Sequence, residues 1–209
     1  MFIKENETVL FQGDSVTDMD RLSDPNGIGV GYVYSTVSSF YALHPEMNVR
    51  FINRGISGNR VKDLQARWKE DALDLNPDVL SVLIGINDTW RRFDSNDPTS
   101  TQAYENSYRD ILTQSRAKNP NLKIILMDPF LLSAPVGDPK EWREDLNPRI
   151  AVVDKLAKEF DAVHIKLDEL FAQACKTVPS TFWAADGIHP DPNGRAFIAF
   201  AWLRAVGAM

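Results

Sequence analysis

The sequence predicts a three-layer α/β fold in which a five-stranded parallel sheet lies between helices. Short apolar runs alternate with longer segments of helical periodicity along the chain, and this alternation is typical of parallel strands joined by right-handed helical crossovers. Three runs are almost continuously apolar, as expected for strands covered on both faces. These runs are Val9–Phe11, Val79–Ile84 and Leu122–Met127.

The strands and helices follow from these patterns in chain order. The expected strands are Thr8–Gln12, Val49–Asn53, Val79–Gly85, Leu122–Asp128 and Ala162–Leu167. The expected helices are Tyr32–Leu43, Val61–Leu75, Ser100–Lys118, Asn147–Phe160 and Asn193–Val206. In the second helix, Leu64, Trp68 and Ala72 recur at a spacing of four, which places them on one face. Pro45 and Pro120 are expected just beyond the ends of two helices, because proline has no backbone N–H to donate and cannot extend a helix.

Two segments lack either periodicity, and we expect them to be loops. They are Asp18–Gly29 and Pro129–Leu146. Each begins at or just past the carboxyl end of an expected strand, where open parallel sheets bind ligands. Since long loops in compact domains are often functional, we expect both to wall the site. The chain contains no repeat or linker, and residues 1–209 are expected to form one domain.

Composition and charge exclude several classes of protein. The 209 residues are 44% hydrophobic and 25% charged, as in ordinary globular proteins. A formal net charge of −6 argues against binding nucleic acid. The single cysteine, Cys175, excludes an internal disulfide and a multi-cysteine zinc site. No apolar stretch approaches a signal peptide or a membrane span. We therefore expect a cytoplasmic protein, provided that no leader preceded this sequence.

Ser15 is the candidate nucleophile. It ends Gly13-Asp14-Ser15, directly after the first expected strand, and a sharp turn from strand to helix exposes a side chain and aims backbone N–H groups at the site. A serine hydroxyl needs a base to take its proton. The alternative interpretation of Ser15 is an N-cap or turn residue, because Gly-Asp-Ser is common turn chemistry.

His189 is the candidate base, by elimination among three histidines. His44 precedes Pro45 at a helix end, where it can cap the dipole, and His164 lies in the fifth strand. His189 follows Asp186 by three residues, and such a turn can bring the carboxylate to Nδ1 and leave Nε2 for Ser15. The alternative is a helix-entry turn that Asp186 only caps.

Gly58 and Asn87 are candidates for an oxyanion hole. They follow the second and third expected strands, and the carboxyl ends of parallel strands converge. Gly58 permits close approach of the backbone to a ligand. Together with the N–H of Ser15, they would supply three donors for the oxyanion of acyl transfer. Each has an alternative interpretation as a turn residue.

These four blocks, in this order, resemble the SGNH (GDSL) hydrolase family. The resemblance covers about Glu7 to Ala205 and implies a three-layer, flavodoxin-like fold. It implies a serine nucleophile with its triad partners and an oxyanion hole, which map to Ser15, Asp186, His189, Gly58 and Asn87. Flanking stretches resemble bacterial intracellular acetylxylan or carbohydrate acetylesterases, namely Asn53–Asn59, Leu64–Trp68 and Ile84–Arg91. One difference is Ala185, where that branch is expected to carry an aromatic residue.

The resemblance implies a serine esterase that removes acetyl groups from carbohydrates such as xylo-oligosaccharides, without a cofactor or metal. The expected partners are a small-molecule ester and further copies of the chain in a homo-oligomer, but no nucleic acid or membrane. Possible substrate contacts are Asp14, Trp90, Trp142 and Trp183. The tryptophans could stack on a sugar ring or simply pack under a loop, whereas Trp68 and Trp202 are expected in the core.

Three other functions stay open. A GDSL lipase, lysophospholipase or arylesterase would use the same residues on other short-chain esters. A metal-dependent phosphohydrolase could use the carboxylates Asp14, Asp18, Asp20 and Asp186 with Mg²⁺. A non-catalytic binding module is a third possibility, although the first turn carries neither a Gly-x-Gly-x-x-Gly fingerprint nor a P-loop.

Overall fold

A computed structural model describes all 209 residues and confirms the five-stranded parallel sheet. The strand order is β2-β1-β3-β4-β5, and every neighbouring pair is parallel. The strands are β1 (Thr8–Gly13), β2 (Arg50–Asn53), β3 (Val79–Leu83), β4 (Lys123–Met127) and β5 (Val163–Ile165). All five begin and end within one or two residues of their expected bounds.

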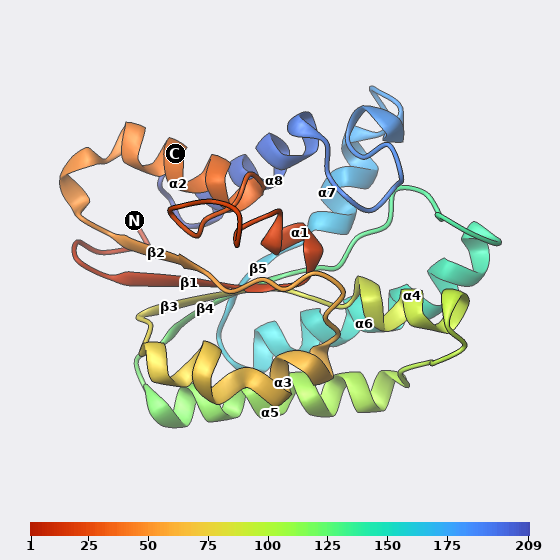
Figure 1. Cartoon of the computed structure of the whole chain (residues 1–209), viewed down its shortest axis with the longest axis horizontal. Helices are drawn as coiled ribbons and strands as arrows, with labels where there is room; N and C mark the ends of the chain where they lie inside the picture. Colours follow the sequence, from red (N-terminus) through yellow and green to blue (C-terminus); the bar gives the residue numbers. More distant parts are fainter.

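Helices cover both faces of the sheet, as the sequence predicts (Figure 1). One face carries α1 (Ser15–Asp18), α2 (Tyr32–Leu43), α7 (Leu167–Ala174) and α8 (Pro192–Ala205). The other carries α3 (Val61–Asp71), α4 (Ile86–Asp94), α5 (Thr101–Lys118) and α6 (Pro139–Glu159). Three short 3₁₀ helices complete the chain: η1 (Pro45–Met47), η2 (Leu73–Leu75) and η3 (Ser180–Phe182). None of the helices is long and apolar enough to span a bilayer.

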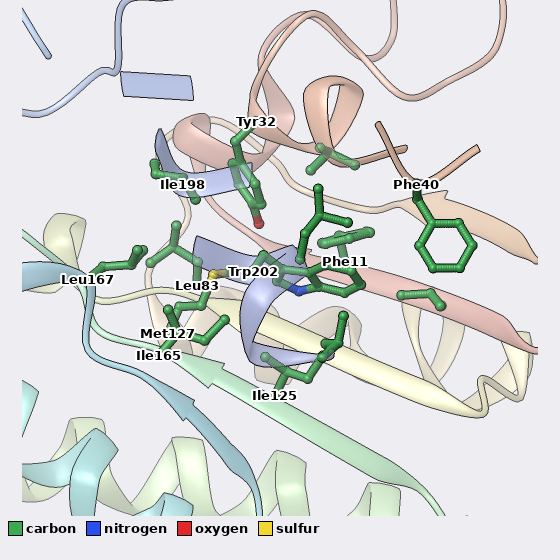
Figure 2. Packing of buried hydrophobic residues seen from close by; sticks show 14 of the residues in the cluster. Phe11, Tyr32, Phe40, Leu83, Ile125, Met127, Ile165, Leu167, Ile198 and Trp202 are labelled. Carbon is green, nitrogen blue, oxygen red and sulfur yellow. The ribbon is translucent and has the colours of Figure 1, made fainter. Parts of the chain in front are cut away.

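Alternate side chains of the strands fill two separate cores. Val9 and Phe11 belong to the core under α2 and α8, whereas Leu10 belongs to the core under α3 and α5, because successive side chains of a strand point to opposite faces. Figure 2 shows Trp202 of α8 beside Phe11, with ring centroids 5.3 Å apart. Trp68 is equally buried in the opposite core, so the core assignment of both tryptophans is confirmed.

The main difference from the sequence-based expectation lies between residues 129 and 146. We expected a loop there, but α6 already begins at Pro139, with the Asp138 side chain capping it by accepting the N–H of Lys140. Pro148 consequently lies inside the helix, where proline is normally disfavoured because it lacks a donor for the preceding turn. The sequence pattern is ambiguous at such a position, since proline is favoured near a helix start.

Besides the single turn of α1, two helices were not expected, α4 and α7. Each follows its strand after a very short connection, of two residues before α4 and one before α7. The break before α4 occurs at Gly85, whose φ of +135° is accessible to glycine. As a result, Asn87 lies in the first turn of a helix rather than in a loop.

Candidate active site

The expected site residues meet at the carboxyl end of the sheet. Ser15 is the first residue of α1, immediately after β1, and the preceding Asp14 caps this helix by accepting the N–H of Val16 at 3.0 Å. Gly58 lies in the segment between β2 and α3, and Asn87 in the first turn after β3. Since β2, β1 and β3 are neighbours and parallel, their following segments lie side by side.

Ser15 and His189 are in hydrogen-bond contact although they are 174 residues apart in the chain. Ser15 Oγ lies 2.8 Å from His189 Nε2, and His189 Nδ1 lies 2.6 Å from Asp186 Oδ2. A carboxylate that accepts the Nδ1–H leaves Nε2 free to accept the Oγ–H of Ser15. The three side chains therefore have the connectivity of a nucleophile, a general base and an orienting carboxylate.

The carboxylate of Asp186 is held in its ionised form. Its second oxygen, Oδ1, accepts the backbone N–H groups of Ile188 at 2.9 Å and His189 at 2.7 Å. Partial burial alone would raise the pKa of Asp186, but the hydrogen bonds from His189 and from these two N–H groups outweigh it, so the pKa lies below its usual value. Asp186 thus orients His189 through the side chain and the backbone together.

The turn that carries Asp186 and His189 is supported by the segment after β4. Gly187 has a φ of +83°, and a Cβ atom there would lie 2.2 Å from the Ser133 carbonyl oxygen and Oγ. The N–H of Leu132 donates to the Gly187 carbonyl at 2.9 Å. Both the conformation and the space therefore require glycine at 187, and Leu132 and Ser133 hold the turn from outside.

Three donors around Ser15 could bind an oxyanion. The backbone N–H groups of Ser15 and Gly58 have no acceptor within the protein, and Gly58 is exposed with a φ of +82°. The side chain of Asn87 is buried, and its Nδ2 donates to the Asn59 carbonyl at 3.1 Å. Because an amide nitrogen carries two protons, one remains for a ligand.

Two other carboxylates near the sheet end are almost fully buried, and their charge is strongly disfavoured. Asp14 is 1% and Asp88 0% exposed. Burial raises the pKa of each to about 7, against the opposing effect of hydrogen bonds from Val16 and Val61, respectively. Asp14 was expected as a possible substrate contact, but its carboxylate is enclosed and caps α1, so it offers no surface to a substrate.

The three tryptophans expected near the site differ in position. Trp90 is half-buried, with its ring centroid 6.0 Å from that of His189. Trp142 is fully buried and stacks on Phe93 at 4.8 Å, which fits the packing interpretation and leaves no exposed face for a sugar. Trp183 packs on Phe197 at 4.9 Å, at the edge of the core under α8. Trp90 is the aromatic side chain beside the triad.

The remaining histidines are held elsewhere. His44 Nε2 is 2.8 Å from the Ala208 carbonyl, and His164 Nε2 is 2.6 Å from Asp128 Oδ1. Helix capping by the His44 ring, which the sequence suggested, is therefore replaced by a contact with the C-terminal segment.

The carboxylates considered for a phosphohydrolase do not form a metal site. Asp14 caps a helix, Asp186 accepts three donors of its own turn, and Asp18 accepts both the N–H and the hydroxyl of Ser57. No three His, Cys, Asp or Glu side chains are placed to hold an ion. The contact between Asp18 and Ser57 had no signal in the sequence.

Comparison with known proteins gives one consistent result. Residues 11–197 match the model of the GDSL-like lipase/acylhydrolase family. The chain is 36% identical to the acetylxylan esterase of Geobacillus stearothermophilus, over 99% of this chain and 97% of that enzyme. The crystal structure of Axe2, an acetylxylan esterase from the same organism, superposes with a TM-score of 0.90, covering 99% of this chain and 97% of the other at 34% identity. A structure from Parabacteroides merdae described as a GDSL-like lipase superposes with a TM-score of 0.93 at 35% identity, covering 99% and 98%.

Proposed function

The chain belongs to the GDSL-like lipase/acylhydrolase family and is a carboxylic ester hydrolase, and from this premise we propose that it deacetylates carbohydrates such as xylo-oligosaccharides. The observation that carries the proposal is the unbroken contact from Ser15 Oγ through His189 to Asp186. The similarity to an acetylxylan esterase along nearly the whole chain supports the substrate class.

In the proposed mechanism, Ser15 Oγ attacks the carbonyl carbon of the acetyl ester while His189 Nε2 takes the hydroxyl proton. The carbonyl oxygen becomes an oxyanion, which accepts hydrogen bonds from the N–H groups of Ser15 and Gly58 and from the Asn87 amide. The bond to the sugar oxygen then breaks, and His189 returns the proton to that oxygen. Water attacks the acetyl-enzyme in the same way, with His189 again as the base, and releases acetate.

Asp186 acts on His189 rather than on the substrate. Its ionised carboxylate fixes the tautomer that presents Nε2 to Ser15, and it stabilises the imidazolium formed during each attack. The lowered pKa of Asp186 supports this role because the carboxylate stays charged when His189 becomes protonated.

The surroundings of the triad favour a small acyl group and a sugar alcohol. Within residues 1–209, every strand and helix belongs to the sheet or to its covering layers, and none forms a separate lid over a fatty chain. Trp90, half-exposed beside His189, presents an aromatic face of the kind that stacks on sugar rings. Ala185 is small and exposed next to Asp186, which leaves room for an acyl group somewhat larger than acetyl.

The substrate class is tested by two measurements on the purified protein. The first is kcat/KM for p-nitrophenyl esters from acetate to octanoate. We expect a maximum at acetate and a decline from butyrate onward. Burying each further CH₂ in an open groove would gain ~0.8 kcal/mol, so a maximum at octanoate would identify a lipase-like enzyme and overturn the sugar-ester proposal.

The second measurement compares acetylated xylobiose with p-nitrophenyl acetate. Trp90→Ala is expected to lower kcat/KM for the sugar ester several-fold more than for the aryl ester, and Trp90→Phe to restore much of the difference. The ratio of the two substrates separates a lost sugar contact from a disturbed His189, because a disturbed base slows both reactions equally. A ratio unchanged by Trp90→Ala would remove Trp90 from the sugar site.

A further inference from the structure

The donors proposed for the oxyanion lie on two separate segments. Ser15 begins α1, and Gly58 lies in the segment 54–59 between β2 and α3. Their N–H groups converge only if this segment is held in a fixed position against α1. The side chain that links the two segments directly is Asp18, at the end of α1.

Asp18 binds the residue immediately before Gly58. Its Oδ2 accepts the backbone N–H of Ser57 at 2.9 Å and the Ser57 hydroxyl at 2.8 Å. The Asp18 side chain is 15% exposed, whereas Ser57 and both hydrogen bonds lie at the surface, so Ser57 is held by two donors on one carboxylate oxygen rather than by burial.

The first part of the segment is held by packing. A Cβ atom on Gly55 would lie 2.4 Å from the Asp18 backbone nitrogen, so the segment lies directly against α1 at that point. The Asn53 side chain adds a hydrogen bond from Nδ2 to the Thr17 carbonyl at 2.6 Å, and Arg21 Nε donates to the Gly55 carbonyl. Up to Gly55, the backbone is therefore held by contacts other than a direct bond to the Asp18 carboxylate, whose Oδ1 lies 3.9 Å from Arg21 Nε.

Gly58 has less support, since only the hydrogen bond from the Asn59 N–H to the Ile56 carbonyl, at 3.2 Å, closes the turn around it. No atom lies within 4 Å of the position where its Cβ would be, and its φ of +82° lies in a region that glycine enters and leaves freely. The Gly58 N–H belongs to the peptide between Ser57 and Gly58, so its direction follows from the backbone conformation of Ser57. Asp18 fixes Ser57 to α1 through the Ser57 N–H and hydroxyl.

We propose that Asp18 is a positioning residue of the oxyanion hole, which holds Ser57 so that the Gly58 N–H points to the same oxygen as the Ser15 N–H. The inference rests on the proposed serine esterase mechanism and adds a residue that touches neither substrate nor triad. Removing a whole oxyanion donor typically lowers kcat by ~10²–10³. A donor that is present but poorly directed is expected to lower kcat by ~10-fold or more.

The experiment compares Asp18→Ala with two matched variants, using p-nitrophenyl acetate. Asp18→Asn keeps an oxygen that can accept both donors of Ser57 and is expected to restore most of the activity. Asp24→Ala is the control from the same loop, because Asp24 likewise accepts backbone N–H groups, those of Ile28 and Gly29 at 2.9 and 3.0 Å. The Asp24→Ala substitution is expected to lower Tm but to leave kcat within about twofold of the wild-type value.

For Asp18→Ala, we expect kcat to fall ~10-fold or more, with KM changed less than about twofold and with an unchanged pH midpoint of kcat. The pH midpoint is the decisive readout, because it reports on the His189–Asp186 pair and a general disturbance of the site would move it. If Asp18→Ala proves too unstable to assay, Ser57→Ala removes only the hydroxyl hydrogen bond and is expected to lower kcat a few-fold.

Three outcomes would overturn the inference. They are a kcat of Asp18→Ala within twofold of the wild type, a shifted pH midpoint, and an Asp24→Ala variant that loses as much kcat as Asp18→Ala. If Asp18→Ala is too unstable to assay, an unchanged kcat of Ser57→Ala would also overturn the inference. Failure of the proposed mechanism itself is distinguishable, because only then does Ser15→Ala retain activity.

Discussion

The nucleophile and the base occupy two different kinds of structure. Ser15 follows the buried interior strand β1, and its neighbour Asp14 is enclosed within the protein. His189 and Asp186 lie in a turn outside the sheet, with side chains 36% and 45% exposed. The pKa shifts of the carboxylates follow this division, since burial raises the pKa of Asp14 and hydrogen bonding lowers that of Asp186.

The contrast shows two ways to place a catalytic group. At the sheet end, position follows from core packing, so a change to a buried side chain there, such as Asp14, alters both stability and activity. In the turn, position follows from a few hydrogen bonds and from the contact of Gly187 with Ser133. Changes in the turn are therefore expected to affect activity more than stability, and the following experiments test this division.

The largest effect on kcat is expected from removing the side chain of Ser15, at the sheet end, or of His189, in the turn. Ser15→Ala and His189→Ala should each lower kcat by at least ~10³-fold, and the double variant should lose little more, because groups that act as one unit are strongly non-additive. Tm should change little in any of the three. Losses that multiply in the double variant would contradict a shared mechanism, and near-native turnover of Ser15→Ala would end the serine esterase interpretation.

The second effect concerns pH and the exposed turn. His189 must be neutral to accept the Ser15 proton, so kcat/KM should fall on the acid side, by about tenfold per pH unit once the imidazole is protonated. Because the pKa of Asp186 is lowered, this carboxylate stays charged while the imidazole titrates. The acid limb of a log plot should therefore have a slope of one. A slope of two, or a flat profile from pH 5 to 9 with chemistry rate-limiting, would contradict this assignment.

The third effect tests the packing of the turn. Gly187→Ala places a Cβ against Ser133 and should displace His189, lowering kcat by ~10-fold or more. Gly137→Ala is the matched control, because Gly137 also has a positive φ, +71°, but no atom lies within 4 Å of its Cβ position. Both variants share the backbone strain of a non-glycine residue. Equal activities in the two variants would show that Ser133 does not position the turn.

Sequence patterns predicted the regular part of the molecule and much of the candidate site. Ser15, Gly58 and Asn87 could be placed together because each follows a strand of a parallel sheet, and strand ends of such sheets converge. His189 could be predicted as the base because Asp186, three residues earlier, can reach its side chain within one turn.

The features that were missed depend on contacts between distant segments. The burial of Trp142 follows from the helical start of α6 at Pro139, which no local pattern distinguished from a loop. The contact between Asp18 and Ser57 joins residues 39 apart in the chain. The raised pKa values of Asp14 and Asp88 result from burial by several segments at once. The residues around either aspartate in the sequence do not show that burial.

The smallest expected effect is on thermal stability, and it should differ in its pH dependence between a buried carboxylate at the sheet end and the exposed carboxylate in the turn. The pKa of Asp88 is raised to about 7 by burial, so folding favours its protonated form, and the stability associated with that form is lost as the pH rises through about 7. Asp88→Asn carries no charge at any pH. Its Tm relative to the wild type should therefore increase by a few degrees between pH 5 and pH 8, since ~1 kcal/mol shifts Tm by ~2–4 °C in a domain of this size.

Asp186→Asn is the comparison for this stability test, because its effect should have the opposite sign. The pKa of Asp186 is lowered, so the stability associated with its charged form is present above its unfolded-state pKa and is lost only as the pH falls through the lower, folded-state value. Asp186→Asn should therefore show no gain in Tm at pH 8, and a small loss because of its exposure. Thermal unfolding of the wild type and both variants at pH 5 and 8 measures the difference. A gain in Tm at pH 8 for Asp186→Asn, or none for Asp88→Asn, would show that burial does not separate the carboxylates at the sheet end from those in the turn.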